Sequence, residues 1–592
     1  MTKPDTHFSV RSRPRASLGL ATTLAMLLTA CSEPASESTA VSAPTAADTV
    51  YTNARVYTVD AANSWAEAFA VKDGAFIAVG SAAEMQQYTD DQTDIVDLEG
   101  RMVMPGIHDM HAHLSQAGTK ELFECGFPFS LGVDEIVTQV SECAQNATEG
   151  EWIRGGQWAM ELLDSDTPPA RAMLDAAAPN NPVLLIDSTV HAVWVNSKAL
   201  EMLGVDDDTA DPVGGVIERD DKGAATGVLF DNAAYQQLSK LPMYSESQMQ
   251  DALAWSIAQF NQVGVTALKD AMVDAPAAAG YAALAANHRL NATVATSLAW
   301  RMAWAGPQDS LERTIESRSQ YASANVQVDF AKIMLDGIPP SQTAAVLEPY
   351  IADGKHPEGH RGYLTQTPES LQEDITALDA RGLTVKVHAT GDRSVRAVLD
   401  AVEAARAANG DSGLRHEVSH AEMIHADDLP RFAKLGVTAE MCPILWYPSP
   451  LHSMMESALG VERSSRFWQA RSLMESGALV IYGSDWPSVV PSANPWPGIE
   501  AMVTRADPYG VNQGMLAPEE ALDLATVLRI FTINGAESMY RADQSGSIER
   551  GKSADFIVLN QNLFDIAPAE IGDTEVLQTV FQGRTVYIAG AN

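Results

Sequence analysis

The chain has 592 residues, which is too long for one ordinary compact domain and fits one large domain with smaller additions. Hydrophobic residues make up 46% of it, enough for a substantial core. Lys and Arg total 39 against 77 Asp and Glu, a formal net charge of −38, and this acidity excludes a nucleic-acid partner because phosphate binding needs a basic face.

Residues 1–31 are predicted to be a secretory signal. Three arginines between residues 11 and 15 precede an apolar run from Leu18 to Leu28, which is too short to cross a bilayer as a permanent helix. The run is followed by Leu-Thr-Ala-Cys, which resembles the bacterial lipobox and implies that Cys31 is acylated. Ser32 stands where an inner-membrane retention signal has Asp, so we expect a lipid-anchored protein of the bacterial cell envelope, on the outer membrane facing the periplasm.

Residues 32–48 consist mostly of Ser, Ala, Thr, Pro and Glu, and they are predicted to be a flexible tether. The β-strand signals that follow in residues 49–104 return in residues 541–592. Both regions contain short runs of β-branched and aromatic residues that are separated by Gly-containing turns. We therefore expect one small β-sandwich built from both chain ends, with a large domain inserted between its halves.

Residues 105–540 alternate between apolar strand patterns and amphipathic helix patterns, which predicts an α/β fold, a (β/α)₈ TIM-like barrel. The predicted strands are Val183–Asp187, Val265–Lys269, Val328–Leu335, Thr384–His388, Val437–Glu440 and Ala478–Tyr482, and the helices include Met249–Val263, Pro368–Arg381, Val395–Ala408 and Ala426–Leu435. Residues from about 120 to 240 follow the alternation poorly and are interpreted as an insertion over the barrel mouth. Within them, Cys125 and Cys143 form either a disulfide or two buried thiols.

The strongest chemical signal is a pair of histidines, His111 and His113, directly after a short apolar strand. In an extended chain, residues i and i+2 point the same way, so both imidazoles can reach one cation. An isolated pair of this kind can have other roles and does not by itself establish metal binding. Four later residues strengthen the metal hypothesis.

These four residues lie in or at the ends of predicted strands. Lys332 lies inside one strand, where its charge must be paired, with Asp336 for example, or lost by carboxylation. His388 and Asp485 each follow an apolar strand, at the end where barrels carry their active sites. His420 ends a further strand, and His416 competes with it as the ligand.

These residues together resemble the metal-dependent amidohydrolase superfamily. The more specific resemblance is to amidohydrolase family three, which includes N-substituted formamide deformylases, and it covers about residues 50 to 590. It rests on Pro105–His113, Trp152–Trp158, Val195–Ser197, Lys332 with Asp336-Gly337, His388–Arg393 and Gly483–Pro487.

The resemblance implies a site with two divalent metals, zinc or else iron, manganese or cobalt. The ligands implied are His111, His113 and Asp485 for one metal, His388 and His420 for the other, and carboxylated Lys332 as the bridge. Asp485 is also the implied general base. His191 either polarises a substrate carbonyl or is structural, and we expect Trp158, Asp336 and Arg393 on the substrate side.

Two departures from the family pattern stand out. His108 replaces an apolar residue of the first motif, and Asp231 stands where the family often has Glu. The reaction predicted is hydrolysis of a small molecule at a non-peptide carbon–nitrogen bond. Ring deamination, ester or lactone hydrolysis, and a non-catalytic ligand-binding lipoprotein are the alternatives. The only other partners considered are the membrane, through the lipid anchor, and a second copy in a homodimer.

Overall fold

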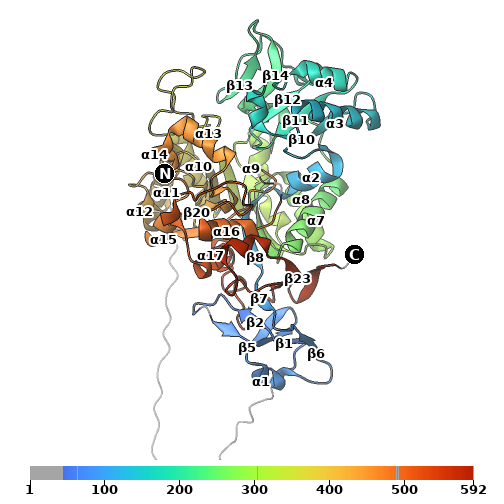
Figure 1. Ribbon diagram of the computed structural model, residues 1–592, viewed down its shortest axis with the longest axis vertical. Coiled ribbons are helices and arrows are strands. Elements are labelled where there is room, and N and C mark those ends of the chain that lie inside the picture. Colours follow the sequence, from blue (N-terminus) through green and yellow to red (C-terminus); the bar gives the residue numbers. More distant parts are fainter. Residues whose placement is uncertain (1–44, 63, 303–304, 489, 491, 591–592) are drawn as a thin grey trace, which may run out of the picture. The chain divides into compact units, whose positions relative to one another are not determined.

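The computed structural model describes residues 45–592, apart from residues 63, 303–304, 489, 491 and 591–592 (Figure 1). The predicted signal, its Cys31 and most of the predicted tether lie outside the described residues. Within the described part of the chain, no helix is both long and apolar enough to cross a membrane.

The centre of the molecule is a nearly closed barrel of eight parallel strands, which confirms the predicted fold class. In chain order the strands are β8 (Ile107–Ala112), β15 (Val265–Val273), β16 (Thr293–Ala299), β17 (Val326–Met334), β18 (Thr384–Ala389), β19 (Glu417–His420), β20 (Thr438–Met441) and β21 (Leu479–Tyr482). Consecutive strands pair, and β21 lies beside β8 where the circle closes. Most of their residues are buried because helices cover the outside and side chains fill the inside.

The covering helices begin at recognisable sequence signals. In α7 (Glu246–Gln262) a capping box joins Ser245 and Gln248, and α10 (Pro368–Ala380) has Thr367 as its N-cap with proline in the first turn. Helices α7 and α10 contact β15 and β18 respectively, and α11 (Asp392–Asn409) also packs on β18. Helices α7 and α10 lead into β15 and β18, whereas α11 follows β18, so helix and strand alternate around the barrel.

The region interpreted as an insertion forms its own sheet, in the order β13-β14-β12-β11-β10-β9 (Figure 1). Its strands are β9 (Cys125–Gly126), β10 (Ile153–Trp158), β11 (Val183–Asp187), β12 (Ala192–Val195), β13 (Gly215–Arg219) and β14 (Ala225–Asp231). The predicted strand Val183–Asp187 thus belongs to this sheet and not to the barrel. A disulfide between Cys125 and Cys143 joins β9 to α3 (Val133–Asn146), which answers the question that the sequence left open.

Two further sheets form the β-sandwich, in the orders β5-β4-β1-β6 and β24-β23-β22-β7-β2-β3. The N-terminal strands are β1 (Thr49–Thr52), β2 (Arg55–Tyr57), β3 (Trp65–Ala66), β4 (Ala68–Lys72), β5 (Ala75–Gly80), β6 (Asp94–Asp97) and β7 (Met102–Pro105), and the C-terminal ones are β22 (Phe556–Leu559), β23 (Val576–Phe581) and β24 (Arg584–Ile588). Strand β7 pairs with β2 on one side and β22 on the other. The ring of Phe69 contacts those of Tyr51 and Phe556, with centroids 4.8 and 4.9 Å away, so both chain ends share one core.

Candidate metal centre

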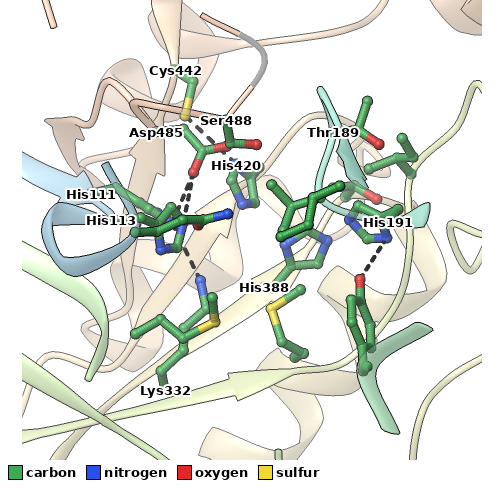
Figure 2. Close-up of a pocket in the computed structure, with 18 of the residues that line it drawn as sticks. His111, His113, Thr189, His191, Lys332, His388, His420, Cys442, Asp485 and Ser488 are labelled. Atoms are coloured by element: carbon green, nitrogen blue, oxygen red, sulfur yellow. Dashed lines mark hydrogen bonds and ion pairs between the residues drawn. The ribbon is translucent and has the colours of Figure 1, made fainter. Parts of the chain in front are cut away.

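All six predicted metal ligands line one cavity of about 280 Å³ at the carboxyl ends of the barrel strands (Figure 2). His111 lies on β8, Lys332 on β17, His388 on β18 and His420 at the end of β19. His113 and Asp485 follow β8 and β21. Barrel enzymes carry their catalytic groups at this end.

Backbone contacts across the closure of the barrel hold Asp485 opposite the two histidines of the first motif. The Asp485 amide donates to the His111 carbonyl at 2.7 Å. Asp109 accepts from the amides of His111 and Ser484, each at 3.1 Å. A side chain at Gly483 would place its Cβ 2.4 Å from the Cβ of His111, so only glycine allows this approach.

The side chains of His111, His113 and Asp485 converge on one point. Asp485 Oδ1 lies 3.0 Å from His113 Nε2 and 3.4 Å from His111 Nε2. The three ligand atoms all lie within 4.8 Å of one another. One carboxylate and two imidazoles are a donor set that a divalent metal can use.

The second group continues from the first without a gap. The His420 ring lies 4.8 Å from that of His111 and 4.6 Å from that of His388, between centroids (Figure 2). Lys332 Nζ lies 3.4 Å from His111 Nε2. Cys442, which the sequence did not single out, places Sγ 3.6 Å from His420 Nδ1.

The protonation of these groups suits a cation. Burial, reinforced by neighbouring positive charges that include Lys332, holds the pKa of His111, His388 and His420 well below the usual range. These imidazoles are therefore neutral at pH 7 and have a free lone pair for a metal. Burial and the charge of Lys386 lower the pKa of Lys332 to about 8, which raises the fraction of its reactive, neutral amine.

His191 enters the cavity from the insertion, in the turn between β11 and β12, with its ring centroid 5.9 Å from that of His388. Its Nδ1 lies 2.7 Å from Asp231 Oδ1 and 2.9 Å from the Tyr235 hydroxyl. Tyr363, from the barrel side, donates to the other oxygen of Asp231. Burial lowers the pKa of His191, but the hydrogen bond to Asp231 and the charge of that carboxylate outweigh it, so the pKa lies above its ordinary value.

The other walls of the cavity are mainly apolar, and the residues responsible are Ile186, Leu238, Met249, Met272, Met334, Ile338, Leu451 and Met455. They come from the insertion, from α7, from the barrel strands β15 and β17, from the segment after β17 and from α13 (Pro450–Leu459). Glu422 is a polar exception. Burial raises its pKa to about 8, and its Oε2 has no hydrogen-bond partner among the described residues.

Three residues predicted on the substrate side do not line the cavity. Trp158 is buried in the core of the insertion, where its indole donates to the Leu185 carbonyl at 3.1 Å. Asp336 binds the loop after β18, accepting from the amides of Thr390 and Gly391 at 3.1 and 3.0 Å. Arg393 donates to the Gly362 carbonyl. Trp158 thus packs in the insertion core, whereas Asp336 and Arg393 contact loop backbone, and Asp336 Oδ1 also lies 3.8 Å from His388 Nε2.

The structure also shows where His416 and His108 lie, the two histidines whose roles the sequence left open. His416 lies at the start of β19, away from the cavity, and contacts Asp379 at 3.0 Å, so His420 alone of this pair faces the other ligands. His108 is buried between the Gly106 carbonyl and the Ser545 hydroxyl, which gives it a structural role.

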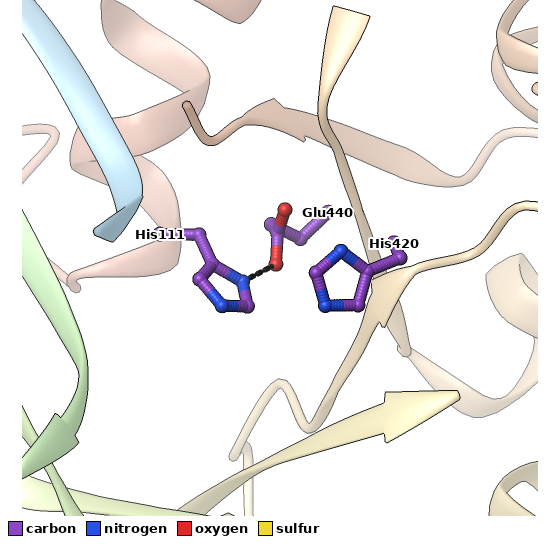
Figure 3. A group of neighbouring side chains, drawn as sticks. All are labelled: His111, His420 and Glu440. Atoms are coloured by element: carbon purple, nitrogen blue, oxygen red, sulfur yellow. Dashed lines mark hydrogen bonds and ion pairs between the residues drawn. The ribbon is translucent and has the colours of Figure 1, made fainter. Parts of the chain in front are cut away.

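Four charged residues inside the barrel were missed by the sequence reasoning: Lys269, Lys386, Glu417 and Glu440. Glu440 lies between His111 and His420, and it contacts His111 Nδ1 (Figure 3). Lys269 has Asp270 beside it, and Glu417 begins the mainly polar strand Glu-Val-Ser-His. Lys386 and Glu440, however, are each the single Lys or Glu of a barrel strand, which was a usable signal. Such a residue must point into the barrel and find a partner there.

The comparisons with known proteins agree with this geometry. A family model described as Amidohydrolase family matches residues 94–587. N-substituted formamide deformylase of Arthrobacter pascens is 30% identical over 553 residues, which cover 91% of this chain and 98% of the relative. Protein LONG AFTER FAR-RED 3 of Arabidopsis thaliana is 30% identical over 548 residues, 91% of this chain and 92% of the relative. The solved structure of an uncharacterized metal-dependent hydrolase from Pyrococcus horikoshii shares the fold, with a TM-score of 0.69, 20% identity and coverage of 88% and 99%.

Proposed function

The chain belongs to the amidohydrolase family and is a hydrolase acting on carbon–nitrogen bonds; from that premise we propose that it hydrolyses small non-peptide amides such as N-substituted formamides. The observation that carries the proposal is the convergence of six potential ligands on one cavity at the catalytic end of the barrel. A family match alone gives the reaction class, whereas this site supplies the groups that the reaction needs.

Two divalent metals fit the donors present. His111, His113 and Asp485 would hold one, and His388 and His420 the other, with carboxylated Lys332 as the bridge. Nitrogen and oxygen donors suit zinc, with iron, manganese or cobalt as alternatives. The neutral state of the buried imidazoles and the lowered pKa of Lys332 support this assignment.

When bound, such metals polarise a carbonyl and lower the pKa of water toward neutrality. Asp485 then accepts the proton of the attacking water and passes it to the departing nitrogen, because its Oδ1 faces the same point as both first-motif histidines. The raised pKa of His191 favours its imidazolium, in which Nδ1–H donates to Asp231 and Nε2–H is a hydrogen-bond donor for the substrate carbonyl oxygen.

The cavity itself supports an apolar substrate of modest size. Its volume of about 280 Å³ lies near the lower end for ligand pockets. The metal end is polar, whereas the methionine and leucine walls suit the hydrocarbon part of an N-substituent. A small acyl group at the metals, with an apolar amine portion against these walls, is the orientation that we propose.

The test is the metal content of the purified chain, measured by elemental analysis, together with turnover of a panel of formamides and amides. We expect about two metals per chain and loss of turnover with a chelator, restored by zinc. In Lys332→Ala the metal content should fall. An unchanged metal stoichiometry would contradict the proposal that Lys332 bridges the two metals. Exclusive turnover of lactones or amino-substituted rings would replace the proposed substrates with the alternative ones.

We also propose that the chain is anchored in the bacterial outer membrane by lipid on Cys31. The lipobox-like Leu-Thr-Ala-Cys sequence supports this location. In cells fed a labelled fatty acid, the full chain should carry the label in the membrane fraction, whereas Cys31→Ser should not. Equal labelling of both chains would disprove the anchor.

A further inference from the structure

A chain of four charged side chains with 0% side-chain exposure crosses the barrel interior beneath the cavity. Lys269 on β15 contacts Glu417 on β19. Glu417 lies 2.9 Å from Lys386 on β18, and Lys386 lies 3.4 Å from Glu440 on β20. The charges alternate in sign, so the network as a whole is neutral, which reduces the cost of burying it.

This network ends at a metal-ligand candidate. Glu440 contacts Nδ1 of His111 (Figure 3). Nε2 of the same ring lies 3.4 Å from both Lys332 Nζ and Asp485 Oδ1. The two nitrogens thus face different surroundings, the network on one side and the cavity on the other. Glu440 does not line the cavity.

A neutral imidazole carries one hydrogen, on either nitrogen. A carboxylate at Nδ1 accepts that hydrogen, which leaves the lone pair of Nε2 directed at the other ligands. Lys386 strengthens the same orientation from the backbone, because its Nζ donates to the carbonyl of Met110 at 2.9 Å, one residue before His111.

We propose that Glu440 is a positioning residue that fixes the tautomer and ring orientation of His111 for metal binding, and that Lys386, Glu417 and Lys269 hold its carboxylate in place. This inference rests on the proposed metal centre. It assigns a purpose to a network that is otherwise costly, because each of its ions would be strongly destabilising if buried alone.

The test is the dissociation constant for Zn²⁺ of the full chain, measured by competition with a chromogenic chelator. Glu440→Gln keeps the shape of the side chain and removes its charge, and the dissociation constant should rise by about 10- to 100-fold. In a His111→Ala background the same change should have little further effect, because the residue through which Glu440 acts is gone.

Asp379→Asn is the matched control, since it removes a buried carboxylate that contacts a buried histidine, His416, away from the cavity. It should lower the melting temperature and leave zinc affinity unchanged. Where Glu440→Gln fails to fold, Glu440→Asp keeps the network charge but withdraws the carboxylate from His111, and it should still weaken zinc binding.

A folded Glu440→Gln chain with an affinity within about twofold of the unaltered chain would overturn the inference, and so would a Glu440→Asp chain with unchanged affinity. An unaltered chain that binds no zinc would instead overturn the proposed metal centre, so the two failures are distinguishable.

Discussion

The backbone of Asp485 adopts a φ of +61°, a conformation that residues other than glycine rarely take, and His420 has a φ of +70°. Both residues follow barrel strands and face the same cavity. Such conformations persist where surrounding contacts impose them, and they are frequent at functional sites. For Asp485, the contacts that impose this conformation are the hydrogen bond from its amide to the His111 carbonyl and the hydrogen bond from the neighbouring Ser484 amide to Asp109.

Asp485→Asn should reduce kcat by about 10²- to 10⁴-fold, because an amide cannot accept the proton of the attacking water. The measurement is turnover of the best substrate from the formamide and amide panel, with the melting temperature and metal content as controls for folding and metal loading. A folded, metal-loaded variant with a near-native rate would contradict the role of Asp485 as general base.

Asp231→Asn should shift the alkaline limb of the pH–activity profile to lower pH. Asp231 raises the pKa of His191, so the imidazolium persists to higher pH, and activity that needs it is lost as pH rises through that pKa. Without the carboxylate the pKa falls and the loss begins earlier. Tyr235→Phe, which removes the neutral partner of Nδ1, is the control and should move the limb less. Superimposable profiles for Asp231→Asn and the unaltered chain would show that His191 does not act as an acid.

The six cavity residues could be predicted from the sequence because each stands in a short, recognisable phrase within or just after a barrel strand. It was insufficient for Glu440 and Cys442, which lie two residues apart at the end of β20. The charge of Glu440 indicates that it points into the barrel, but the sequence does not show which of the other strands carries its partner. Trp158 was predicted on the substrate side, but it lies in the core of the insertion. A tryptophan in a strand suits a pocket and a core equally well, so the sequence alone could not decide between them.

At the scale of elements, the predicted ranges overlap β15, β17, β18, β20 and β21 of the barrel, whereas β16 and the strand order of the insertion sheet were not predicted. All six residues of β18 and the stretch Phe330–Ile333 of β17 are buried, because a barrel strand packs on both of its faces. In the insertion, β10 pairs parallel with β11, but β12 pairs antiparallel with both β11 and β14. A mixed sheet of short strands has no single repeat, so its order depends on contacts between distant residues that the sequence does not display.

The disulfide should stabilise the insertion, since it closes a segment with a sequence separation of 18 in a region with its own core. The loss of the cross-link in Cys125→Ser/Cys143→Ser should cost about 3 kcal/mol by the chain-entropy relation. The measurement is denaturant unfolding, monitored by limited proteolysis within residues 120–240. Equal unfolding midpoints for the double variant and the unaltered chain would contradict the prediction.

At the scale of the whole molecule, a formal net charge of −38 implies strong self-repulsion at low ionic strength. Raising NaCl from about 0.05 to 1 M shortens the screening length to about 3 Å, so the melting temperature should rise by several degrees. Thermal unfolding at matched pH checks this, with sucrose as an uncharged control solute. A melting temperature that falls with salt would show that attractive ion pairs outweigh the repulsion.

The β-sandwich has a consequence for the order of biosynthesis. Strand β7 needs β22 as its neighbour, and the rings of Tyr51 and Phe69 need Phe556 as a cover, yet β22 is made almost last. A nascent chain or a product truncated before residue 556 leaves one edge of β7 unpaired and an aromatic cluster open to water. Unpaired strand edges and exposed apolar clusters of this kind are binding sites for chaperones and proteases. The unpaired edge of β7 and the open aromatic cluster therefore mark a chain in which β22 is missing. Both are covered once β22 has been made and has paired with β7.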